Sequence, residues 1–112
     1  MESILNSIKK LLGPSAEQTH FDPDIIMHIN SVFSILTHMG VGPVKGFRIQ
    51  DDLNTWEEFI QGSEKIELVK SYIHIRVKLL FDPPLNSAVI AAMKEDIREM
   101  EWRLNSIAES TL

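Results

Sequence analysis

The chain contains residue types that can bind metal ions or act in catalysis, but their spacing does not form a recognised metal-binding or catalytic motif. The chain has four histidines, His20, His28, His38 and His74. None of them belongs to an HExxH or related metal-binding spacing. Asp24 and His28 lie one helical turn apart and could share a metal ion, but the sequence offers no further ligands to complete the set. We therefore expect no metal and no cofactor.

Catalytic nucleophiles and acid–base pairs are not indicated either. Glu57 and Glu58 are adjacent, so on a helix their carboxylates point in different directions and make a poor acid–base pair. The serines and threonines occupy positions that helix caps and polar helix faces explain. The chain has no cysteine, which excludes disulfides and thiolate chemistry and is typical of a reducing cytoplasm. By elimination, the sequence predicts a binding or structural module and not an enzyme.

Composition indicates a single domain over residues 1–112 whose partners are proteins. No apolar run approaches the roughly 20 residues that span a bilayer, so no membrane contact is expected. Lys9 and Lys10 follow the first apolar positions, which is the reverse of the charge order in a signal peptide. The net charge of −5 argues against nucleic-acid binding, because Lys and Arg supply most of the non-specific affinity for phosphate.

The residues that remain of interest must be positioned by helices, and one helix organises the others. Residues 64–81, within the stretch from Ser63 to Pro84, are apolar over more than half of the helix circumference. One stripe consists of Ile66, Val69, Ile73, Val77 and Leu80, and a second of Leu68, Tyr72, Ile75 and Leu79. A helix of this kind is normally packed between partners, so we expect it at the centre. Phe81, Asp82, Pro83 and Pro84 end it, because proline cannot continue a helix.

The chain before this helix predicts two helices and a long loop. Residues 3–12 have amphipathic helical spacing, and their helix is either a docking element or a strut on the protein's own core. A second helix should run from Pro23 to Met39, with Asp22 as its N-cap and Gly40 in the left-handed position after it. A loop over about residues 40–54 follows, with a short extended piece at residues 47–49.

Two more helices complete an all-α prediction. Asn54 or Thr55 caps a short helix that carries Trp56 and ends at Gly62. Trp56 is expected to plug the core, with ligand stacking as the alternative. A last helix runs from residue 86 or 87 to about residue 107. Its apolar seam comprises Val89, Ile90, Met93, Ile97, Met100, Leu104 and Ile107. The predicted fold is a compact bundle of about four to five helices, with the two-sided helix at residues 64–81 in its centre.

Three surface features suggest interfaces. The outer face of the second helix is polar but uncharged, and it carries Asn30, Ser31, Ser34, Thr37 and His38. Charge depletion marks interface cores, although drift in composition would also account for it. The loop glycines are expected to display Phe47 and Arg48. Trp102 points away from the seam of the last helix, which indicates either an interface or a surface stack with Arg98.

Arg76 is the one charge between the two apolar stripes of the central helix. An unpaired buried charge would cost several kcal/mol, on the order of 3 to 5 when one partner is removed. We therefore predict that Arg76 is paired with a carboxylate such as Asp82, Glu57 or Glu58.

The assembled features resemble a known family. Residues 21–43 read FDPDIIMHINSVFSILTHMGVGP, residues 55–60 read TWEEFI, residues 70–84 read KSYIHIRVKLLFDPP and residues 93–105 read MKEDIREMEWRLN. Together they are similar to the head-tail connector proteins of tailed bacteriophages, also called head-completion or adaptor proteins. The resemblance covers roughly residues 4–105, and residues 70–84 are its most specific block.

This resemblance implies a structural virion protein without enzyme activity, made in the bacterial cytoplasm and located at the head–tail interface. It implies a cyclic homo-oligomeric ring beneath the portal protein, with a dodecamer as one candidate size. The ring would extend the channel through which DNA passes and would receive a stopper or tail-completion protein. Asn30, Ser34, His38, Phe47, Arg48, Arg98 and Trp102 then become candidate subunit or portal contacts, and Arg76, Trp56 and residues 81–84 structural positions. The alternative is a small helical regulatory module, such as a helix-turn-helix DNA binder, although no predicted helix carries a basic face.

Overall fold

A computed structural model describes residues 2–61 and 63–110 of the chain. Its α-helices are α1 (Ile4–Leu12), α2 (Asp22–His38), α3 (Trp56–Phe59), α4 (Ser63–Phe81) and α5 (Ser87–Ser110). Two short 3-10 helices, η1 (Pro14–Ala16) and η2 (Thr19–Phe21), connect α1 to α2. Extended pairing in the described ranges is limited to an isolated antiparallel bridge between Ser3 and Thr55. The prediction of an all-α bundle of four to five helices is confirmed.

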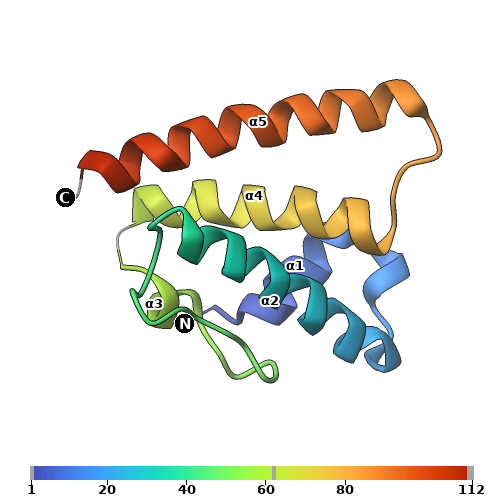
Figure 1. The fold of residues 1–112 in the computed structure, drawn as a ribbon. Coiled ribbons are helices and arrows are strands. Elements are labelled where there is room, and N and C mark those ends of the chain that lie inside the picture. The colour runs from blue at the N-terminus through green and yellow to red at the C-terminus, as the bar shows by residue number, and fades with distance from the viewer. Residues whose placement is uncertain (1, 62, 111–112) are drawn as a thin grey trace.

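Helix α4 is the centre of the molecule, as its two apolar stripes predict. Helices α1 and α2 pack against one side of it, and α5 lies along the opposite side (Figure 1). Val69, Tyr72, Ile73 and Val77 of α4 are completely buried. They meet buried side chains of α1, α2, the loop and α3, among them Ile4, Ile8, Ile29, Phe33, Leu36, Ile49 and Trp56. Helix α5 adds Ile97, Met100 and Leu104 from its C-terminal half.

The ends of the helices follow local chemistry, with one exception. The Ser3 side chain accepts a hydrogen bond of 3.2 Å from the Asn6 amide and caps α1. Asn86 caps α5 by accepting from the Ala88 amide at 2.8 Å. The prediction that Asp22 caps α2 is wrong, because η2 leads directly into α2 and makes Asp22 its first residue. The Asp22 carboxylate instead lies 2.7 Å from Lys9 Nζ of α1.

The loop after α2 begins as predicted. Gly40 has a φ of 85°, and the Val41 amide donates to the Leu36 carbonyl at 2.9 Å, which closes the helix end in the manner of a Schellman motif. The extended piece predicted at residues 47–49 does not form a strand. Thr55 is the cap of α3, and its amide donates to the Glu58 carboxylate at 2.9 Å. The predicted stop at Gly62 lies outside the described residues.

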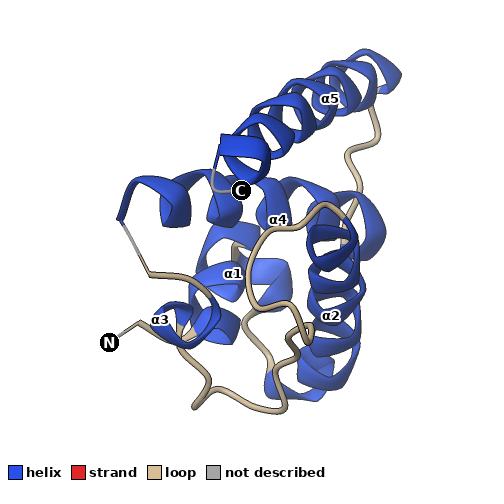
Figure 2. Ribbon diagram, turned by 60° about the vertical axis from the view of Figure 1, so that its left-hand side comes forward, coloured by secondary structure: helices blue, strands red, loops and turns tan. Residues whose placement is uncertain are grey.

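Two apolar positions assigned to the core are at the surface. Leu80 of α4 is 55% exposed and Val89 of α5 is 45% exposed. The reason is the direction of α5, whose N-terminal half extends away from the rest of the bundle (Figure 2). The apolar seam of α5 has the predicted helical periodicity, but α4 covers only the C-terminal part of this seam. Helix α5 also continues to Ser110, beyond the end predicted near Ile107.

Candidate interaction surfaces

The polar face of α2 and the loop after it form one hollow, which we call the α2 groove. It has a volume of about 810 Å³. Its lining consists of Pro23, Ile26, Met27, Asn30, Ser31, Ser34, Thr37, His38, Lys45, Gly46, Phe47 and Arg48. The structure therefore brings together two features that the sequence suggested separately: the polar face with Asn30, Ser34 and His38, and the loop with Phe47 and Arg48. Lys45 and Arg48 are the formally charged residues of this lining, and both are basic.

Local hydrogen bonds explain why the polar face of α2 needs no charged groups. The Asn30 side chain donates to the Ile49 carbonyl at 2.9 Å and accepts from the Ile49 amide at 2.8 Å. This pair of bonds holds the end of the piece predicted as extended, residues 47–49, against α2. Ser31 and Thr37 donate to carbonyls of their own helix, at 2.7 and 3.0 Å. Asn30 thus has a structural role in fixing one wall of the groove, in addition to the interface role predicted for it.

Phe47 is not displayed as the sequence suggested. Its ring lies 5.0 Å from the ring of Phe33 and 5.4 Å from that of Phe59, with edge-to-face geometry, and the side chain is half-buried. An aromatic side chain of this size gains more from the cluster with Phe33 and Phe59 than from exposure to water. Phe47 therefore forms part of the groove floor, whereas Arg48 beside it is exposed. The role of Phe47 as a partner contact stays a prediction.

Helix α5 presents a second surface, which we call the α5 outer face. Glu95, Asp96, Arg98, Glu99 and Trp102 line a shallow hollow of about 330 Å³ on the side of α5 turned away from α4. Trp102 is 70% exposed. Among the cation–π contacts of the described residues, none places the Arg98 guanidinium over the Trp102 ring, and this guanidinium donates to Glu95 Oε1 at 2.8 Å. The indole face is therefore open to a partner.

A third exposed surface was missed at the corner between α4 and α5. Leu80, Leu85 and Val89 are all largely exposed there. A signal for it does exist in the sequence, because no charged residue occurs from Pro83 to Met93. Exposed apolar side chains that lie together in this way are a candidate interaction surface.

A hydrogen-bonded cluster joins α4 to α5 and resolves the question of Arg76. Arg76 Nη2 donates to Glu101 Oε2 at 2.6 Å, and Arg76 Nε donates to the Tyr72 hydroxyl at 2.7 Å. The Tyr72 hydroxyl donates in turn to the same Glu101 oxygen at 2.7 Å. Pairing of Arg76 with a carboxylate is confirmed, but the partners named from the sequence were wrong. Asp82 is engaged elsewhere, and Glu101 comes from the helix that packs against this side of α4.

The electrostatics of this cluster are consistent with a charged pair. Burial would raise the pKa of Glu101, but the hydrogen bonds from Arg76 and Tyr72 outweigh it and lower that pKa below its ordinary value. Burial and the hydrogen bond to Glu101 raise the pKa of Tyr72 to about 12. Both effects keep the glutamate ionised and the tyrosine protonated, so the cluster is a fixed clamp between α4 and α5.

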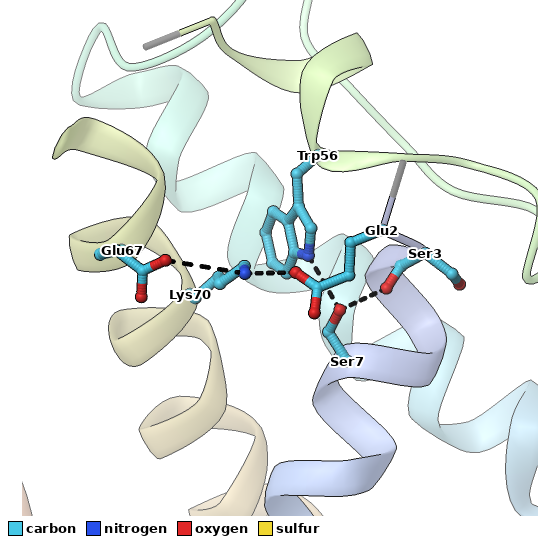
Figure 3. A network of polar contacts seen from close by, with 6 residues as sticks. All are labelled: Glu2, Ser3, Ser7, Trp56, Glu67 and Lys70. Carbon is cyan, nitrogen blue, oxygen red and sulfur yellow. Dashed lines mark hydrogen bonds and ion pairs between the residues drawn. The ribbon is translucent and has the colours of Figure 1, made fainter. Parts of the chain in front are cut away.

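A second cluster holds the N-terminal segment and α3 against α4 (Figure 3). The indole nitrogen of Trp56 donates to Ser7 Oγ of α1 at 3.0 Å, and both side chains are buried. Lys70 of α4 pairs with Glu2 and lies 5.7 Å from the centre of the Trp56 ring. The hydrogen bond from Lys70 lowers the pKa of Glu2. The expectation that Trp56 is a core residue is confirmed, and its ring is not available for ligand stacking.

The end of α4 is also fixed by contacts to the N-terminal region. Asp82 accepts hydrogen bonds of 2.9 Å from Lys78 and from Ser15. Those two bonds lower the pKa of its carboxyl group. The Phe81 ring lies edge-on to Phe21 at 5.5 Å. Residues 81–84 therefore set the corner between α4 and α5, with Pro83 and Pro84 beyond the last helical turn.

Within residues 2–61 and 63–110, no group of three or more His, Asp or Glu side chains could hold a metal ion. None of the helices there has the length and apolar character needed to cross a membrane. The α2 groove and the α5 outer face are the two hollows lined by interface residues that the sequence suggested.

Comparison with known proteins gives one finding of weight. A family model described as phage connector protein matches residues 4–111, a range that includes all five helices. No curated protein and no solved structure matches the chain.

Proposed function

Because this chain belongs to the phage connector protein family, we propose that it forms a cyclic ring beneath the portal protein, extends the DNA channel and joins the capsid to the tail. The membership makes the chain a structural connector of the phage particle. We add three points to this membership. They are the ring, its place under the portal, and the docking of a stopper or tail-completion protein on the other side of the ring. No enzyme activity is part of the proposal.

The single observation that carries the proposal is the extent of the family match, which includes every helix from α1 to α5. The shape of the protomer supports it. In a ring built head to tail, one patch of each subunit meets a different patch of its neighbour. The α2 groove and the α5 outer face are two such unlike patches on one protomer.

The charge of the chain supports the passage of DNA without binding. A net charge of −5 repels phosphate, so a channel made of this protein would let DNA slide.

The test is assembly on the portal. Purified protein is mixed with portal rings, and the product is analysed by native mass spectrometry and negative-stain imaging. We expect an added ring of this protein on one end of the portal, whether or not the protein forms rings alone. Absence of portal binding under all assembly conditions, together with a salt-sensitive shift of duplex DNA, would instead support a DNA-binding module.

A further inference from the structure

The α2 groove and the α5 outer face carry opposite charges. Lys45 and Arg48 are the charged residues that line the groove, and Arg48 is exposed. The α5 outer face has three acidic residues, Glu95, Asp96 and Glu99, and one basic residue, Arg98, which is already paired with Glu95. Complementary charge of this kind steers association and fixes the orientation of two surfaces.

The two surfaces also fit in their apolar parts. Trp102 is 70% exposed at the C-terminal end of the α5 outer face, and tryptophan is among the residues that most often dominate binding energy when they enter a pocket. The groove offers apolar walls, because Ile26, Met27 and Phe47 line it and Met27 is 59% exposed. Its volume of about 810 Å³ is ample for an indole ring.

The positions of the two surfaces favour a repeating contact. The α2 groove lies on the side of α2 opposite to its buried residues, and the α5 outer face lies on the side of α5 opposite to Ile97 and Leu104. Helices α2 and α5 flank α4 from opposite sides (Figure 1). Because each surface lies on the outer side of its helix, the two surfaces face away from each other. A contact between them cannot form within one protomer, but it can join one protomer to the next.

We propose that the α5 outer face of one protomer docks into the α2 groove of a second copy of this chain, with Trp102 between Met27 and Phe47 and with Glu95 and Glu99 near Lys45 and Arg48. The inference rests on the proposed function, since it names the surfaces through which the connector ring is built. The contact is heterologous, so repetition of it generates a ring or an open helix of subunits.

The experiment reverses the charges of each surface separately. The groove variant carries Lys45→Glu and Arg48→Glu, and the face variant carries Glu95→Lys and Glu99→Lys. The matched control carries Glu17→Lys and Asp52→Lys, which change the net charge as the face variant does but lie at exposed positions outside both surfaces. Circular dichroism verifies the fold of each protein, and native mass spectrometry with portal rings measures its assembly.

Each variant alone is expected to lose the assembled ring, because like charges then face each other across the contact. The control is expected to assemble as the wild type does. An equimolar mixture of the two variants is expected to recover assembly with alternating subunits. In that mixture, every acidic groove meets a basic face and every basic groove meets an acidic face. Trp102→Ala should reduce assembly without a change in the helical signal, because the indole is largely exposed in the protomer.

The outcomes separate this inference from the function on which it rests. If the wild type binds the portal as a ring and both variants do so equally well, the docking surfaces are wrong and the connector function stands. If each variant fails but the mixture does not recover, the surfaces contact the portal and not a second copy, which also overturns the inference. If the wild type never assembles on the portal, both the function and the docking contact are refuted.

Discussion

Arg76 is the residue whose removal should disturb the bundle most among the ion-paired side chains. Arg76→Leu leaves Glu101 without its cation and removes the Arg76 Nε–H that donates to the Tyr72 hydroxyl. Arg76 and Glu101 are 30% and 31% exposed, so the loss should be smaller than the roughly 3 to 5 kcal/mol expected for a fully buried pair. Hydrogen bonds to charged groups contribute about 1.5–3 kcal/mol, and we expect the free energy of unfolding to fall by about that amount. Urea denaturation followed by circular dichroism measures the change.

Arg98→Leu is the matched control for this prediction. It removes the same charge from the same pair of helices and also breaks a 2.8 Å ion pair, but Arg98 and Glu95 are largely exposed. Exposed pairs contribute about 0–1 kcal/mol, so this variant should stay close to the wild type. Equal destabilisation by both substitutions would mean that the cluster of Tyr72, Arg76 and Glu101 does not clamp α5.

Ser7 should be a second sensitive position, although serine is small and its loss creates little space. Ser7→Ala leaves the indole N–H of the buried Trp56 without its acceptor. An unsatisfied buried donor costs about 1–3 kcal/mol, and we expect destabilisation in this range by the same urea assay. Ser106→Ala removes an exposed serine that bonds to its own helix at the Trp102 carbonyl, and it should be neutral or slightly stabilising.

For single residues, the sequence indicated that a polar side chain needs a partner, but it did not indicate which residue that partner is. The position of Arg76 between two apolar stripes required a carboxylate, whichever helix supplied it. Glu101 lies 25 residues away on another helix, so its selection depends on how α5 crosses α4. The bond between Ser7 and Trp56 spans 49 residues and has no local signature at all.

Helix α5 is an element whose two halves should differ in stability. Ile97, Met100 and Leu104 hold its C-terminal half on α4, whereas most residues from Ser87 to Asp96 are exposed. Local opening is easiest where few apolar contacts are lost. In the isolated protomer, hydrogen exchange read by NMR should therefore be faster for amides 91–96 than for amides 98–106. Equal protection along α5 would show that the helix opens only as a unit.

Gly42 lies where the loop passes close to Phe59 of α3, and the space there admits no side chain. Its φ is 89°, and a Cβ atom there would lie 2.4 Å from Cε1 of the buried Phe59. Gly46 also has a φ of 90°, but a Cβ atom there would lie 3.7 Å from Thr37 Oγ1, which is an ordinary contact and not a clash. Left-handed conformation costs roughly 1–2 kcal/mol for a residue with a side chain, and overpacking adds about 1–3 kcal/mol.

Gly42→Ala should accordingly be more destabilising than Gly46→Ala, because only Gly42 adds overpacking against Phe59 to a positive φ. The difference between the two midpoints in thermal denaturation measures that contribution. Similar losses for the two variants would indicate that Phe59 moves aside, and that its cluster with Phe33 and Phe47 is loosely packed.

The helices themselves were largely predictable from the sequence, but which of their apolar residues are buried by another helix was not. Periodicity and caps identified the helices, because those signals lie within one or two turns of sequence. Val89 and Leu80 satisfy the same periodicity as Ile97 and Val77, yet only the latter two are buried. The direction in which α5 leaves the corner at Pro83 and Pro84 decides this, and hydrophobic spacing contains no information about that direction. For the same reason, the sequence suggested the α2 face and Phe47 separately but not the groove that unites them.

The whole molecule should lose stability on acidification in two stages. Burial lowers the pKa of His74 from its ordinary value of 6.5, although a hydrogen bond to the Leu11 backbone opposes the shift. A histidine with a depressed folded pKa binds its proton more readily in the unfolded chain, so stability falls as the pH drops through 6.5 and toward the folded pKa. The carboxylates of Glu2, Asp82 and Glu101 have lowered pKa values and add a second loss below their ordinary range near pH 4.

The first stage can be assigned to one residue. In His74→Gln, which keeps a side-chain donor for Leu11, the decline in unfolding free energy between pH 7 and pH 5.5 should largely disappear while the loss below pH 4.5 remains. His20→Gln, at an exposed histidine, provides the comparison and should leave both stages in place. Urea titrations at half-unit pH intervals measure the two slopes separately. Because His74 contacts the end of α1 from the middle of α4, persistence of the first stage in His74→Gln would mean that some other group titrates, and that the packing of α1 on α4 is insensitive to mild acid.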